Sequence, residues 1–185
     1  MLEEINRTES FLKKGEIILY PTDTVWGIGC DATDEKSVKR IFEIKNREES
    51  KSLIILVDSI EMLQQYIDEI PEDALKILKE NKKPTTIIYN NPKGLAKNTI
   101  ASDNTVAIRI PDDEFCKQLI KKFGKPIVST SANISGEPTA KSFSEISNAI
   151  LNSVDYVVDL HREKITQKSS TILRIDNGSV IVIRE

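Results

Sequence analysis

Short runs of β-branched residues alternate with amphipathic segments along this sequence, and no other feature restricts the fold so strongly. Such alternation is typical of α/β proteins, in which helices cover a sheet. The chain has 185 residues, about the length of one domain, and neither an internal repeat nor a Pro/Gly/Ser-rich linker divides it. We therefore predict a single α/β domain over residues 1–185, with a mixed parallel and antiparallel sheet flanked by helices.

Apolar spacing and turn residues predict the individual elements. An opening helix ends at Lys13-Lys14-Gly15, Asp34 caps the next helix, and Pro71 opens the second of two helices after residue 57. Further helices are expected at 115–123 and 143–151, and strands at 17–20, 53–57, 85–89, 105–110, 126–129, 154–158, 170–175 and 180–184. Residues 22–32 are expected to form a long polar connection. Asn177-Gly178 predicts a hairpin between the last two strands.

Composition excludes several classes of protein. Lys+Arg total 26 against 29 Asp+Glu, and the net charge of −3 argues against a uniformly basic nucleic-acid-binding surface. No apolar run approaches the roughly 18 residues of a membrane span, so no membrane partner is expected. The N-terminus is acidic where a secretion signal is basic. Cys30 and Cys116 lie far apart, so we expect two buried thiols in a cytoplasmic protein.

The sequence lacks the motifs that commonly hold phosphate or metal. It contains no G-x-x-x-x-G-K-[ST] loop, no G-x-G-x-x-G, no H-E-x-x-H and no Cys/His cluster with metal-ligand spacing. The one histidine, His161, lies in a polar stretch and is expected to be a solvated loop residue. Any phosphate ligand must therefore be held by cationic side chains, hydroxyl groups and loop amides.

Two polar segments directly follow predicted strands, where open α/β sheets bind their ligands. Residues 20–29 read YPTDTVWGIG and offer the Thr22 and Thr24 hydroxyls beside glycines that permit close backbone approach. Residues 129–136 read STSANISG and offer neutral donors for phosphate or carboxylate oxygens. An ordinary turn-rich connection is the alternative for each segment.

Lys45 and Arg109 are cations that fall within otherwise apolar patterns. Lys45 is in phase with Ile41 and Phe42, so its stem extends out to solvent or its ammonium points into a cleft that holds an anion. Arg109 lies on the strand face opposite Ile108. It either binds a carboxylate through two parallel hydrogen bonds or is exposed.

Five blocks, taken in this order, resemble the YrdC/TsaC family, the threonylcarbamoyl-AMP synthases that begin the synthesis of threonylcarbamoyladenosine in tRNA. They are YPTDTVWGIG from Tyr20, KNR from Lys45, TVAIRIP from Thr105, STSANISGEPT from Ser129 and SSTI from Ser169. The resemblance implies a YrdC-like fold, with a twisted mixed sheet around a central cleft. It also implies the short, single-domain type of this family.

The resemblance implies a nucleotidyltransferase that condenses L-threonine, bicarbonate or carbon dioxide and ATP into threonylcarbamoyl-adenylate and pyrophosphate. The threonine amine captures carbon dioxide as a carbamate, and the carbamate oxygen attacks the α-phosphorus of ATP. Mg²⁺ is expected to bridge the ATP phosphates with few protein ligands, and no protein metal site is predicted. The implied partners are the tRNA-modification proteins that accept the adenylate.

Carried over position by position, the resemblance implies three overlapping sets of site residues. The catalytic set is Lys45, Arg47, Ser131 and Asn133. The ATP-binding set is Arg47, Lys51, Thr105, Ser131, Thr139 and Arg184. The threonine-binding set is Thr22, Arg109, Ser129 and Ser170, with Arg109 on the substrate carboxylate.

The chain also departs from the family pattern. Glu48 stands where many relatives have proline, and Leu56 stands where longer members have a histidine that contacts threonine. The main alternative function is a non-catalytic module that binds double-stranded RNA or tRNA, and a carbamoyl-transfer accessory domain is a further one. The net charge and the few aromatic residues argue against RNA as more than a weakly bound ligand.

Overall fold

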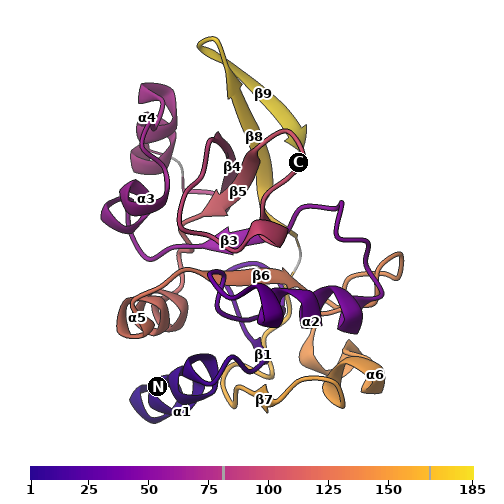
Figure 1. The fold of residues 1–185 in the computed structure, drawn as a ribbon. Helices are drawn as coiled ribbons and strands as arrows, with labels where there is room; N and C mark the ends of the chain where they lie inside the picture. Colours follow the sequence, from indigo (N-terminus) through magenta and orange to yellow (C-terminus); the bar gives the residue numbers. More distant parts are fainter. Residues whose placement is uncertain (81, 167) are drawn as a thin grey trace.

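The computed structural model describes residues 1–80, 82–166 and 168–185, and these form a twisted nine-stranded sheet (Figure 1). The strand order is β7-β1-β2-β6-β3-β5-β4-β8-β9. The strands are β1 Ile18–Tyr20, β2 Gly27–Gly29, β3 Ile54–Leu56, β4 Thr85–Asn90, β5 Thr105–Arg109, β6 Ile127–Ser131, β7 Tyr156–Val157, β8 Thr171–Asp176 and β9 Ser179–Arg184. The predicted mixed sheet is confirmed, because β1–β7, β3–β5 and β4–β8 pair in parallel and the other neighbours pair antiparallel.

Helices flank this sheet. They are α1 Leu2–Lys13, α2 Glu35–Lys45, α3 Ile60–Tyr66, α4 Glu72–Glu80, α5 Glu114–Phe123 and α6 Asn148–Leu151, with short 3-10 turns at Lys97–Thr99 and Phe143–Glu145. Figure 1 shows α1, α3, α4 and α5 along the left of the view and α6 on the right. α1 packs against α5, although more than a hundred residues separate them in the chain. Within the described residues, no helix combines the length and the apolar character that crossing a bilayer requires.

Capping residues fix both ends of α2, so Lys45 lies in its last turn. The Asp34 carboxylate accepts hydrogen bonds from the backbone N–H groups of Lys36 and Ser37, which caps the first turn. Asn46 adopts the left-handed conformation (φ 48°) that ends the helix. The apolar stripe is buried as predicted, and Lys45 is buried with it.

β6 is the fourth of the nine strands, next to the central β3, and its polar end is the base of the candidate site. One edge of β6 pairs with β2, which sets Gly27 beside Ser131. The other edge pairs with β3, which sets Ile54 beside Ser129. The STS segment therefore lies between β2 and β3, as part of a strand rather than of a free turn.

Three predicted elements differ from the structure. The segment 22–32, expected to be a polar connection, contains the strand β2, whose Gly-Ile-Gly sequence carries no strand signal and which is held by pairing to β1 and β6. The helix expected at 143–151 is broken, because Ile146 and Ser147 are extended and Ser147 caps a new helix, α6. The strand expected at 154–158 is reduced to the two residues of β7 that pair with β1.

Other expectations are confirmed. Cys30 and Cys116 are free and fully buried, and burial raises the pKa of both thiols. His161 is an exposed loop residue. Asn177 and Gly178 both have positive φ and join β8 to β9 in the predicted hairpin. This hairpin extends to the top of Figure 1 in yellow, and the apolar residues 180–183 of β9 are exposed on it.

Gly29→Ala is expected to lower the free energy of unfolding by about 2–3 kcal/mol, because overpacking forces backbone shifts. A Cβ at Gly29 would lie 2.5 Å from the carbonyl oxygen of Val128 and 2.7 Å from a ring carbon of Tyr20. Denaturant titration measures this loss. Gly27→Ala is the matched control, because its nearest neighbour is the rotatable Ser129 hydroxyl at 3.2 Å. Equal losses in the two variants would refute the steric explanation.

Candidate active site

The loop between β1 and β2 is ordered by a directional chain of hydroxyl hydrogen bonds. Thr22 Oγ1 donates to the Val25 carbonyl at 2.8 Å and accepts from the Thr24 backbone N–H at 3.0 Å. Because the only proton of Thr22 Oγ1 goes to Val25, the 3.0 Å contact between the two hydroxyls is donated by Thr24. All of the hydrogen-bonding capacity of Thr22 Oγ1 is therefore used within the loop.

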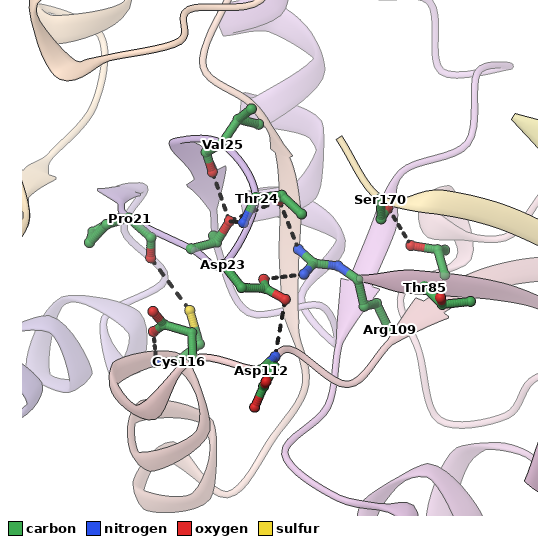
Figure 2. A network of polar contacts seen from close by, with 12 residues as sticks. Pro21, Asp23, Thr24, Val25, Thr85, Arg109, Asp112, Cys116 and Ser170 are labelled. Carbon is green, nitrogen blue, oxygen red and sulfur yellow. Dashed lines mark hydrogen bonds and ion pairs between the residues drawn. The ribbon is translucent and has the colours of Figure 1, made fainter. Parts of the chain in front are cut away.

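Arg109, at the end of β5, forms a buried ion pair with Asp23 of the same loop (Figure 2). Its Nη1 donates to Asp23 Oδ1, and its Nη2 lies 3.4 Å from Thr24 Oγ1. The second oxygen of Asp23 accepts from the backbone N–H of Asp112 at 3.0 Å. The Arg109 and Asp23 side chains are 3% and 7% exposed. The sequence left open whether Arg109 binds a carboxylate or is exposed to solvent. The prediction of an exposed Arg109 is wrong.

Lys45 is buried and holds the turn that follows β6. Its Nζ donates to the carbonyls of Ser131 and Asn133 at 2.5 and 2.6 Å. Its own carbonyl accepts from the backbone N–H of Ser135 at 2.8 Å. Burial, and then the charge of Arg47, lowers the pKa of Lys45 to about 8. The ammonium therefore points inward, onto backbone carbonyls, and the reading in which it extends to solvent is wrong.

A cavity of about 210 Å³ opens beside these groups. It is lined by seven of the predicted site residues: Arg47, Arg109, Ser129, Ser131, Thr139, Ser170 and Arg184. Separate parts of the chain supply them, from the end of α2 to the end of β9. Among the described lining residues there are three arginines and no carboxylate. The cavity therefore suits an anionic ligand.

The arginines around this cavity are partly desolvated. Arg47 Nη2 donates to the Ser52 carbonyl at 2.9 Å, and Arg184 Nη2 donates to the Ser170 carbonyl at 2.8 Å. Burial lowers the pKa of both arginines, and the charge of Arg109 lowers that of Arg184 further. The charges of Arg109 and Arg184 therefore repel each other, and a bound anion would offset both this repulsion and the cost of burying the arginines.

Three predicted site residues are not among the described lining residues of the cavity. Thr22 is buried inside its loop. Lys51 is exposed, and its carbonyl accepts from Arg47 Nε at 3.5 Å. Thr105 lies at the opposite end of β5 from Arg109, and its hydroxyl donates to Asp103 at 2.6 Å. Their assignment to ATP and threonine stays a prediction.

Two more, Lys45 and Asn133, lie behind the lining instead of in it. Asn133 Nδ2 donates to the carbonyls of Ile134 and Glu137 at 3.1 and 2.8 Å. Its Oδ1 is buried and, within the described part of the chain, has no partner. In this structure both side chains shape the turn that carries Ser131 into the cavity.

Comparison with known proteins shows the family. The Sua5/YciO/YrdC family model, described as telomere recombination, matches residues 10–185. The chain belongs to this family. A relative from Pseudoalteromonas translucida, named threonylcarbamoyl-AMP synthase, is 38% identical over 175 residues, or 91% of each chain. A relative from Methanocaldococcus jannaschii is 36% identical over 188 residues, which cover 99% of this chain and 87% of the relative.

A solved structure of the same family supports the fold. The crystal structure of P. abyssi Sua5 complexed with L-threonine superposes with a TM-score of 0.89 over 97% of this chain, at 31% identity. The chain spans 53% of that protein, about half of its length. The predicted YrdC-like fold and the predicted family are thus confirmed for this Sua5/YciO/YrdC member.

The lining of this Sua5/YciO/YrdC cavity does not fit a metal bound by the protein alone. Its polar groups are arginines and hydroxyls, and the nearby Asp23 carboxylate is occupied by Arg109 and Asp112. No group of three or more His, Cys, Asp or Glu side chains in residues 1–80, 82–166 and 168–185 could hold a metal ion. Mg²⁺ brought in by a phosphate ligand would not need such a ligand set.

Sequence reasoning named Thr24 as a candidate hydroxyl but left it out of the binding sets of this Sua5/YciO/YrdC site, and it missed the contact of Asp23 with Arg109. Thr24, not Thr22, lines the cavity, and Asp23 is the partner of Arg109. Both lie within the YPTDT segment, but spacing alone does not tell which hydroxyl of a turn faces inward. Leu56, where longer members have histidine, is fully buried in β3 and is absent from the described lining.

Proposed function

We propose that this chain is a threonylcarbamoyl-AMP synthase, which condenses L-threonine, bicarbonate or carbon dioxide and ATP into threonylcarbamoyl-adenylate and pyrophosphate. One observation carries the proposal: three arginines and several hydroxyls from distant segments line one cavity with no carboxylate among the described lining residues. The name of the P. translucida relative and the threonine complex of P. abyssi Sua5 agree with it.

The cavity offers the groups that adenylation requires. The triphosphate carries most of the charge, so Arg47 and Arg184 would bind it, with the hydroxyls of Ser131 and Thr139 as neutral donors. Mg²⁺ arriving with ATP would neutralise charge on the phosphate oxygens. The carbamate is itself the nucleophile, so the protein need not supply one. Its contribution would be positioning and electrostatic stabilisation, which dominate phosphoryl-transfer catalysis.

The threonine would lie at the Arg109 side of the same cavity. Arg109 would bind its carboxylate, while the Ser129 and Ser170 hydroxyls would orient its polar groups. The Ser170 hydroxyl is 2.8 Å from the buried Thr86 hydroxyl, which fixes its position. This arrangement would bring the carbamate formed on the threonine amine towards the phosphates held by Arg47 and Arg184.

The adenylate is a reactive mixed anhydride, so a second protein must consume it quickly. We infer that its acceptors are the tRNA-modification proteins that transfer the threonylcarbamoyl group, and that the reaction takes place in the cytoplasm. RNA binding as the main activity has less support, because the clustered arginines lie in a cavity and not on an open basic surface.

Pyrophosphate release is expected only when ATP, L-threonine and bicarbonate are all present. A coupled phosphate assay with each component omitted in turn tests this. Equal release without threonine or without bicarbonate would indicate hydrolysis of ATP to AMP and pyrophosphate with no coupling to those substrates. No release in the complete mixture, together with tight salt-dependent binding of tRNA, would favour the RNA-binding module instead.

A further inference from the structure

The arginine proposed to bind the substrate carboxylate already has a carboxylate partner. Asp23 and Arg109 are both almost fully buried, and Arg109 lines the cavity. A buried ion pair of this kind gives little net stability, because desolvation of the two charges offsets their attraction. The position of Asp23 beside the cavity therefore calls for an explanation other than stability.

The contacts of Arg109 leave one edge of its guanidinium without a full set of hydrogen-bond partners among the described residues. Nη1 lies on the Cδ side of the planar group and is held by Asp23. Nε and Nη2 form the other edge, which presents two parallel N–H groups. Nε is buried and, among the described residues, has no partner. Nη2 carries two hydrogens, and its long contact with Thr24 takes one of them at most.

The loop holds this arrangement rigidly. The second oxygen of Asp23 is fixed by the backbone N–H of Asp112, so the carboxylate cannot rotate freely (Figure 2). Thr24 Oγ1 gives its proton to Thr22 and so can only accept from Arg109 Nη2. Asp23 and Thr24 thus hold Nη1 and one hydrogen of Nη2 from the side of the loop, and Nε has no partner among the described residues.

We propose that Asp23 is a positioning residue, which holds Arg109 by Nη1 so that the Nε–Nη2 edge is left free to bind the carboxylate of the amino-acid substrate. This proposal rests on the proposed function and adds to it the residue that orients the threonine-binding arginine. An unpaired buried N–H carries a desolvation cost that a bidentate carboxylate would remove.

An effect of the Asp23 charge alone would change threonine affinity in the opposite direction, so the direction of the change distinguishes the two roles. A negative charge on Asp23 repels a second carboxylate bound to the same arginine. If Asp23 acted only through its charge, its neutralisation would tighten threonine binding. If Asp23 acts by orienting Arg109, its neutralisation weakens threonine binding.

The experiment compares the full-length protein with its Asp23→Asn variant. Calorimetry measures binding of L-threonine and of ATP, and the pyrophosphate assay measures the KM of each. We expect the Kd and KM of threonine to rise roughly 10- to 100-fold, since small misplacements of a binding group have effects of this size. The Kd and KM of ATP should change less than about threefold, which is within the variation expected of a single weak contact.

Asp31→Asn is the matched control. Asp31 is a buried carboxylate, 8% exposed, that pairs with Lys125 at 2.8 Å outside the cavity. Its loss should lower stability without changing the Kd of threonine. An equal loss of threonine binding in both variants would show that Asp23 acts only through stability.

Three further outcomes are decisive. Threonine binding by Asp23→Asn as tight as in the native protein, or tighter, overturns the positioning role and leaves the proposed function intact. A native protein that binds no threonine refutes the proposed function itself.

If Asp23→Asn does not fold, Thr24→Val removes the other anchor and keeps the ion pair. Its threonine KM should rise roughly 3- to 10-fold, the worth of one hydrogen bond, and an unchanged KM overturns the proposal.

Discussion

Lys45→Met is expected to lower pyrophosphate release by roughly 100-fold or more, an effect comparable with the loss of a preorganised donor. The variant keeps an unbranched side chain only one atom shorter than lysine but removes both hydrogen bonds to the carbonyls of Ser131 and Asn133. The turn that carries Ser131 into the cavity would lose its anchor, and the positive charge nearest that turn would disappear. Steady-state kinetics of pyrophosphate release measures the effect.

Lys39→Met is the matched control, because Lys39 is exposed on the same helix, α2. Its turnover should equal that of the native protein. Turnover of Lys45→Met within threefold of native would show that the two carbonyl contacts do not matter for the reaction. Circular dichroism of both variants checks that α2 and the sheet are retained.

The lowered pKa of Lys45 also predicts how the free energy of unfolding depends on pH, with Lys45→Met as the reference. The folded protein holds this group at a pKa of about 8, whereas the ordinary value of 10.5 applies when the chain is unfolded. Between these pH values the unfolded chain binds the extra proton, so stability rises with pH. The free energy of unfolding of the native protein, relative to Lys45→Met, should therefore increase by roughly 3 kcal/mol across this window. A decrease would contradict the burial of a charged Lys45.

Arg109→Gln is expected to weaken threonine binding by roughly 100-fold, because truncating one partner of a buried charged contact has effects of this size. ATP binding should be largely kept, since Arg47 and Arg184 remain in the cavity. The variant should also lose about 3 kcal/mol of stability, because the Asp23 carboxylate is left buried beside an uncharged side chain. Calorimetry with each ligand and denaturant titration measure the two effects.

The double variant Arg109→Gln/Asp23→Asn separates these effects. Removing the second charge should restore much of the lost stability, because no unpaired carboxylate is left buried. Threonine binding should stay weak, since the guanidinium is still missing. If the double variant recovered threonine binding together with stability, Arg109 would act through the fold and not through the substrate.

The sequence predicted most of the fold because its local signals are strong. Asp34 caps the start of α2, Gly124 ends α5 in the left-handed conformation, and Asn177-Gly178 forms the last turn. β2 was missed because a Gly-Ile-Gly strand has no propensity of its own and exists only through pairing to both neighbours.

The candidate site was predicted less completely, for a geometric reason. Motif matching found the segments, and the cavity brings seven of their residues together. It did not show that Lys45 binds carbonyls behind the lining, or that Asp23 is the partner of Arg109. Such contacts join residues 86 positions apart and depend on side-chain directions, which no spacing rule contains.

Both cysteines are shielded in the interior, and this has a practical consequence. Cys30 follows β2 and Cys116 lies in α5, so the two sulfurs sample different parts of the molecule. Alkylating reagents attack the exposed thiolate, which the folded chain does not present. Labelling followed by peptide mass spectrometry would therefore report where the protein opens first under heat or denaturant, with no engineered probe.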